Sequence, residues 1–140
     1  MQENGFELVD NRKSRIIDQI KTTIIELVHH HKEKPDHINI SDFLAKEMGY
    51  DYSYLSNLFS SVEGTTIEKY HIHQKIEKVK ELLVYDELTL NEISFNLGYS
   101  SVQHLSNQFK KITGLSPSHF KKLKAFKRKP LDEVLHPKTI

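Results

Sequence analysis

The chain has 140 residues, no cysteine and a formal net charge of +1 at pH 7. A chain of this length buries roughly two-thirds of its unfolded surface, and the lack of cysteine excludes disulfides, thiolate zinc sites and cysteine nucleophiles. Its apolar runs are far shorter than the roughly 20 residues that span a bilayer, and its start has no signal-peptide pattern. We therefore expect a cytoplasmic protein with no membrane partner.

The small net charge hides an uneven distribution. Residues 1–64 hold seven Lys and Arg against eleven Asp and Glu, whereas residues 65–140 hold thirteen against eight. Within residues 100–129 there are eight bases and no acid. Positive potential is therefore concentrated at one end of the chain, where a polyanion would bind.

The first half of the chain has the periodicity of helices. Apolar residues recur at three- and four-residue steps over about residues 13–31, which predicts an amphipathic helix that ends before Pro35. A short helix follows, with either Asn39 or Ser41 as its N-cap, and Gly49 stops it.

Two longer helices come next, over about residues 51–62 and 66–85. Thr89 and Glu92 have the spacing of a capping box at the start of a further short helix, which Gly98 ends.

The last two predicted helices cover about residues 100–112 and 116–124, the second with Pro117 in its first turn. The alternation of apolar and polar residues that is typical of a β-strand does not persist anywhere in the sequence, so we predict an all-α protein of about seven helices. Residues 125–140 form a basic tail that we expect to be mobile.

Two parts of the chain are near-copies of each other, with YLSNLF at 54–59 and HLSNQF at 104–109. Each copy consists of a short helix, a glycine turn and a longer helix, which predicts two helix-turn-helix units. The matched positions are Gly49-Tyr50 with Gly98-Tyr99, Leu55-Ser56-Asn57 with Leu105-Ser106-Asn107, Phe59 with Phe109, Gly64 with Gly114, and Tyr70 with Phe120. We expect the aromatic residues Tyr50, Phe59, Tyr99, Phe109 and Phe120 to belong to the core.

The repeat divides the chain into five segments. We predict an N-terminal linker-like segment at 1–12, a first helix-turn-helix subdomain at 13–65, a linker helix at 66–86, a second subdomain at 87–124 and the tail at 125–140.

The second helix of the second copy has one polar face. At 100° per residue, Gln103 and Asn107 lie opposite the apolar Leu105, together with Lys110 and Lys111. Asn and Gln can bond an adenine edge with two hydrogen bonds, and lysines neutralise phosphates. In the first copy serines replace the glutamine and both lysines, so its polar face has the weaker chemistry for DNA.

Other kinds of site are poorly supported. His71 and His73 are two residues apart on a helix, so their side chains diverge and cannot hold one ion; His29, His30, His31 and His37 offer no better set. The sequence also lacks a nucleophile with its base, a carboxylate pair and a phosphate loop. We therefore expect no metal, no cofactor and no enzymatic activity.

The stretch from Leu88 to Lys124 resembles the AraC/XylS family of bacterial transcription regulators. The residues that carry the resemblance are Gly98-Tyr99, Phe109-Lys110-Lys111, Gly114, Ser116-Pro117 and Phe120. The likeness extends more loosely over about residues 13–124. It implies a bipartite domain for double-stranded DNA, such as a promoter site, in which each unit can place its second helix in a major groove.

The resemblance also implies which residues contact DNA. Those expected at bases are Ser53, Ser56 and Asn57 in the first unit and Ser101, Gln103, His104, Ser106 and Asn107 in the second; those expected at phosphates are Lys110, Lys111, Lys121 and Lys122. The lysines after residue 120 have a second interpretation, as a solubilising tail. Because Phe59 is not followed by basic residues, we do not expect strong phosphate anchoring by the first unit.

The family commonly adds an upstream effector-binding or dimerisation domain, and RNA polymerase is a further candidate partner. We expect the chain either to act alone or to be a fragment without that domain, and its opening residues favour the fragment. The alternative function is a helical protein-interaction module that retains the scaffold with weak DNA reading, and its support is the serine-rich first copy.

Overall fold

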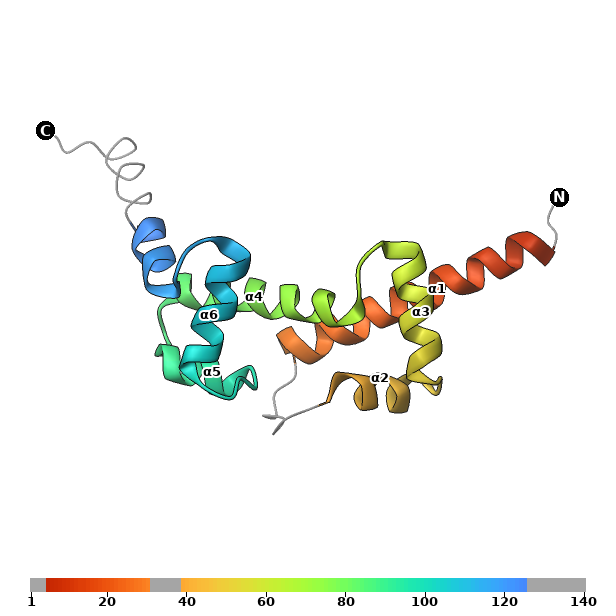
Figure 1. Ribbon diagram of the computed structural model, residues 1–140, viewed down its shortest axis with the longest axis horizontal. Coiled ribbons are helices and arrows are strands. Elements are labelled where there is room, and N and C mark those ends of the chain that lie inside the picture. The colour runs from red at the N-terminus through yellow and green to blue at the C-terminus, as the bar shows by residue number, and fades with distance from the viewer. Residues whose placement is uncertain (1–4, 31–38, 126–140) are drawn as a thin grey trace, which may run out of the picture. The chain divides into compact units, whose positions relative to one another are not determined.

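The computed structural model describes residues 5–30 and 39–125, and side chains from residue 11 onward within those ranges (Figure 1). All regular structure in the described residues is helical, which confirms the all-α class. The chain divides into two compact units, residues 1–75 and 76–140. The helix α4, Ile67–Tyr85, runs through this division and contributes to both units. No helix in the described ranges is long and apolar enough to cross a membrane.

The described residues of the first unit form three α-helices and one π-helix before α4. These are α1 (Gly5–Ile25), which continues into the π-helix η1 (Glu26–His30), then α2 (Ile40–Met48) and α3 (Tyr52–Glu63). The α3 helix packs against both α1 and α2. Residues without any exposed surface form its core: Ile20, Ile24, Leu44, Leu55, Phe59 and Ile67.

The helix-turn-helix of this unit depends on local capping. The Asn39 side chain accepts hydrogen bonds from the backbone of Ser41 at 3.0 Å and Asp42 at 3.3 Å, so Asn39, rather than Ser41, is the N-cap. At the other end Gly49 has φ +75° and donates its N–H to the Ala45 carbonyl at 2.9 Å. This left-handed conformation strains any residue with a Cβ, and it turns the chain from α2 into α3.

The second unit repeats this plan with α5 (Leu90–Asn96), α6 (Val102–Thr113) and a helical segment at 117–125. The predicted capping box is confirmed: the Thr89 N–H donates to Glu92 at 2.8 Å, and the Glu92 N–H donates to Thr89 at 3.1 Å. Ile76, Val79, Ile93, Leu105 and Phe109 are completely buried in this unit.

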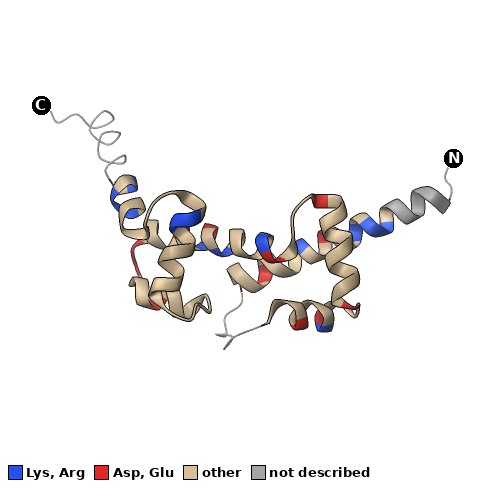
Figure 2. Ribbon diagram, viewed as in Figure 1, with Lys and Arg blue, Asp and Glu red and all other residues tan. Residues whose placement is uncertain are grey.

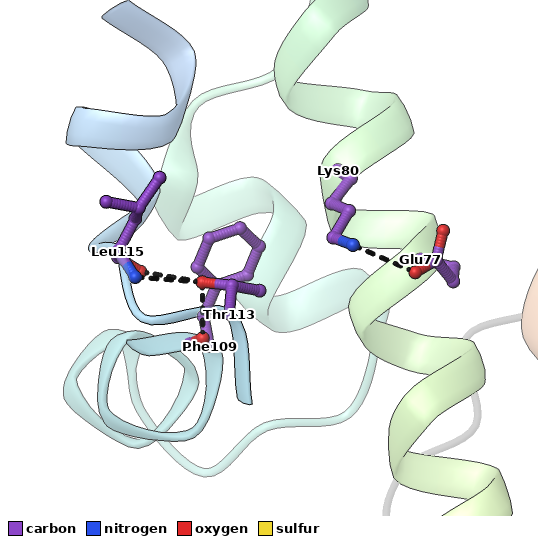
Figure 3. A network of polar contacts seen from close by, with 5 residues as sticks. All are labelled: Glu77, Lys80, Phe109, Thr113 and Leu115. Atoms are coloured by element: carbon purple, nitrogen blue, oxygen red, sulfur yellow. Dashed lines mark hydrogen bonds and ion pairs between the residues drawn. The ribbon is translucent and has the colours of Figure 1, made fainter. Parts of the chain in front are cut away.

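The end of α6 is closed by one threonine (Figure 3). The Thr113 hydroxyl donates to the Phe109 carbonyl at 2.8 Å and accepts the Leu115 N–H at 3.1 Å. On α4 of the same unit, Lys80 and Glu77 form an ion pair of 3.0 Å on the helix surface. The threonine side chain thus joins the last turn of α6 to the residue after Gly114. The helix ends at Gly114, which has a left-handed conformation and donates its N–H to the Lys110 carbonyl at 2.8 Å.

Three expectations about local structure were wrong. The first helix begins at Gly5, eight residues before the predicted start, because no proline interrupts residues 5–13. Its last turn is a π-helix, for which the apolar spacing carries no signal. Tyr50 is only half-buried, whereas Tyr99 is 7% exposed, because the Tyr50 ring packs on Tyr54 at the surface instead of on the core. The tail residues 126–140, His31 and His37 lie outside the described residues.

The turn before α6 supplies a test of the backbone argument. Gly98 has φ +76°, and no atom beyond its two chain neighbours lies within 4 Å of where a Cβ would stand, so the constraint on this residue is conformational rather than a clash with packed atoms. We expect Gly98→Ala to lower the free energy of unfolding by about 1 kcal/mol, and Gly98→Asn to lower it less, because asparagine tolerates the left-handed region. Urea denaturation measures both; equal losses would contradict the argument.

A half-buried histidine on α4 makes stability depend on pH. Burial lowers the pKa of His71 to about 4, and the charge of Lys75 adds to this lowering. The unfolded chain therefore binds a proton that the folded chain does not, and the stabilisation present above pH 6.5 is lost progressively as pH falls toward 4. We expect His71→Gln to flatten this part of the profile of unfolding free energy against pH. The exposed His73, changed to Gln, is the matched control and should leave the profile unchanged.

Candidate nucleic-acid interface

The α6 helix separates its residues into a buried and an exposed side. Leu105 and Phe109 have no exposed surface and fix the rotation of the helix against its unit. The side that consequently faces solvent carries Gln103, His104, Asn107, Lys110 and Lys111, all of them exposed. The predicted polar face is thus present, with two cations in the last turn of the helix.

Two amides on this face are joined to each other. The Gln103 side chain donates from Nε2 to Oδ1 of Asn107 at 2.8 Å, across one helical turn. The bond holds two flexible side chains in one arrangement before any ligand arrives. It leaves the Gln103 oxygen and the Asn107 amide hydrogens for bonding to a ligand.

His104 is also held in place. Its Nδ1 lies 3.2 Å from the Ser100 hydroxyl, and its ring stands edge-on to Tyr99, with 5.1 Å between ring centroids. The Tyr99 hydroxyl donates to Gln108 at 2.6 Å, and burial raises the pKa of Tyr99, so this group stays protonated. The turn residues therefore position the first turn of α6.

Not every predicted contact residue is equally exposed. Ser101 is the N-cap of α6, and its hydroxyl oxygen accepts the His104 N–H at 3.0 Å, so capping occupies part of its bonding capacity. Ser106 is half-buried. Lys121 forms an ion pair with Asp86, whereas Lys122 is exposed.

The first unit presents a different surface. Ser53 and Asn57 are exposed on α3, and Ser56 is half-buried. The α3 helix contains no Lys or Arg, and at its end Glu63 forms an ion pair of 2.9 Å with Lys21 of α1. Its N-cap residue, Asp51, makes no side-chain capping bond. The α3 helix can therefore offer hydroxyl and amide groups, but no cation.

Basic residues that the sequence pattern did not reveal lie on α1. Arg12 and Lys13 line a pocket together with Tyr50 and Tyr54, which belong to the turn and first helical turn of α3. Nearly forty residues separate the two bases from the tyrosines, so nothing in the local pattern could associate them.

The described residues contain no group of three His, Asp or Glu side chains that could hold a metal ion. Their polar contacts are those of helix caps, surface ion pairs and a face open to solvent. Such an arrangement can recognise a ligand by hydrogen bonds and charge.

Comparison with known proteins agrees with this description. Residues 44–123 match the family model of a helix-turn-helix domain. The regulatory protein SoxS of Salmonella typhimurium is 31% identical over 103 residues, which cover 74% of this chain and 94% of that protein. The uncharacterized HTH-type transcriptional regulator YtdP of Bacillus subtilis is 25% identical over 116 residues, and the match covers 83% of this chain but 15% of YtdP.

Solved structures show the same fold. The DNA-binding domain of AdpA, a global transcriptional factor crystallised with a target DNA, superposes with a TM-score of 0.67 at 18% identity and covers 81% of this chain and 96% of that domain. YtdP is thus a transcriptional regulator by name and SoxS a regulatory protein. Since the family match takes in the turns and second helices of both units, more than half of the chain, this chain belongs to the AraC/XylS family of transcription regulators.

Proposed function

We propose that the chain recognises double-stranded DNA sequence-specifically by placing α3 and α6 in major grooves, with α6 as the principal reader. The observation that carries this proposal is the exposed face of α6, where a preorganised amide pair is followed by two lysines. A helix of this kind fits the major groove, where its first turns reach base edges and its later residues reach the backbone.

The amide pair has the chemistry to read adenine. Adenine presents an acceptor, N7, and a donor, the N6 amino group, to the major groove. With Gln103 already donating to Asn107, the Gln103 oxygen can accept from N6 while the Asn107 amide donates to N7. We assign the neighbouring positions to the same surface: His104 at its edge, and Ser101 and Ser106 as lesser contacts because of their capping role and partial burial.

Lysines provide the sequence-independent part of binding. Lys110 and Lys111 are exposed in the last turn of α6, and Lys122 is exposed in the following helical segment. Lys121 already pairs with Asp86 and would have to exchange that partner for a phosphate. In the first unit Ser53, Ser56 and Asn57 are the proposed base contacts, of which Asn57 has the greatest bonding capacity.

The larger relatives also support proposals for partners. The chain spans 15% of YtdP and 36% of the Msm operon regulatory protein of Streptococcus mutans. We propose that it acts in the bacterial cytoplasm, with RNA polymerase as a partner at the promoter and with an effector-binding or dimerisation domain as its regulator.

The phosphate contacts can be tested by salt dependence. The duplex used is one enriched by the chain from a random pool. Each phosphate neutralised by a lysine contributes about 0.9 to the slope of log affinity against log salt. We expect Lys110→Ala with Lys111→Ala to reduce that slope by about 2 and to weaken cognate and random duplexes alike.

The control removes the same charge from α4 of the same unit, by Lys78→Ala with Lys80→Ala, and should change the slope little because both lysines pair with glutamates. If the unaltered chain showed no duplex binding at low salt, the protein-interaction alternative would replace this proposal.

The base contacts require a different comparison. We expect Asn107→Ala to cost about 1–3 kcal/mol on the cognate duplex and little on random DNA, because it removes a base contact. Gln103→Ala should behave similarly. The double variant should lose less binding free energy on the cognate duplex than the sum of the two single losses, because each single change already breaks the bond between the amides. Additive losses, or equal losses on both DNAs, would refute the paired reading.

A further inference from the structure

An open pocket of about 330 Å³ lies on the first unit, lined by Arg12, Lys13, Tyr50 and Tyr54. It joins three elements: α1 supplies the two bases, the turn after α2 supplies Tyr50, and the first turn of α3 supplies Tyr54. Both bases are exposed, so the positive charge of the pocket faces solvent.

The tyrosines give the pocket a defined wall. The rings of Tyr50 and Tyr54 are 5.4 Å apart between centroids and tilted by 34°, and Tyr54 remains 42% exposed. A hydrogen bond to the Tyr50 hydroxyl and the proximity of both phenols raise the pKa of Arg12. The guanidinium therefore lies beside the aromatic wall of the pocket.

The second helix of the first unit carries no cation, unlike that of the second unit. The α6 helix has Lys110 and Lys111 after its phenylalanine, but α3 has Ser60 and Ser61 at the matching positions. Figure 2 shows no basic residue on α3, whereas α1 carries several beside it. The last residue of α3 is even an acid, Glu63.

The pocket lies beside the part of α3 that would enter a DNA groove. Tyr54 directly follows Ser53, which is exposed in the first turn of α3. In helix-turn-helix proteins the first turn of the second helix reaches base edges, so side chains next to it meet the phosphates that border the groove. Arginine binds a phosphate through two parallel hydrogen bonds, and tyrosine hydroxyls also donate to phosphate oxygens.

We propose that Arg12 and Lys13 bind a backbone phosphate of the DNA that α3 enters, with Tyr50 and Tyr54 shaping the site. The first unit would thus be anchored by α1 at the beginning of α3, whereas the second unit is anchored by α6 itself at its end. This inference rests on the proposed DNA binding, and it adds a contact that α3 and its sequence pattern do not contain.

The test uses the complete chain and its enriched duplex, with phosphate contacts mapped by ethylation interference. We expect Arg12→Ala with Lys13→Ala to abolish interference at phosphates beside one half-site only, and to reduce the salt slope by about 1–2. Lys110→Ala with Lys111→Ala should abolish interference at the other half-site. Tyr50→Phe removes only the hydroxyl beside Arg12. It should reduce the interference at the same phosphates as the α1 double variant, but to a smaller extent.

The control is Lys46→Ala with Lys69→Ala, which removes two exposed bases of the first unit that do not line the pocket. It should keep the complete interference pattern, and far-UV circular dichroism should show unchanged helix content in all variants. If the α1 double variant gave the pattern and slope of this control while the α6 double variant lost its half-site, the phosphate site would be refuted and the proposed function kept. If the unaltered chain did not bind duplex DNA, both would be refuted.

Discussion

Each unit is organised around one buried phenylalanine of its second helix. Phe59 stands edge-on to Tyr70, with 5.7 Å between ring centroids, and Phe109 stands edge-on to Phe120 at 5.5 Å. In both units the partner lies eleven residues further along the chain, beyond a glycine in the left-handed conformation. Burying such a side chain contributes about 1.5–3 kcal/mol, and the edge-on geometry adds about 0.5–1.5 kcal/mol, so burial stabilises the contact more than the ring geometry does.

This contact decides which residues can recognise a ligand. Once Phe109 and Leu105 point inward, the geometry of the helix leaves Gln103 and Asn107 on the opposite side. The exposed residues contribute little to the packing and are free to differ between the two copies. The chain has therefore kept one core arrangement twice, while the chemistry of the exposed faces has diverged.

The two units consequently differ in where their positive charge comes from. The second helix of the second unit carries its own lysines, and its amides are already joined before DNA is present. The second helix of the first unit is uncharged apart from Glu63, which pairs with Lys21 of α1, and Arg12 and Lys13 of α1 line the pocket at its first turn. A helix that lies far away in sequence can replace a missing cation because electrostatic attraction depends on distance in space alone.

Much of the fold could be predicted from the sequence because its signals are local. Helix spacing, the capping box of Thr89 and the glycine turns each depend on residues within one or two turns of each other, and the structure confirms them. The exposed side of α6 followed from the same local geometry. Ser101 caps α6 through a local bond as well, but its position at the start of the helix is compatible with both a capping role and a DNA contact, so the pattern alone did not identify the cap.

Other features depended on contacts between residues distant in sequence. Tyr50 and Tyr99 occupy matching positions in the repeat, yet Tyr99 is buried and Tyr50 lies against Tyr54 at the surface. The pocket beside α3 exists only because α1 packs there and brings Arg12 to the Tyr50 hydroxyl. The helices, their turns and the polar face of α6 can thus be predicted from the sequence alone, since they follow from backbone geometry. The contacts between side chains of separate helices can be seen only in the folded chain, because packing brings together residues that are distant in sequence and share no local pattern.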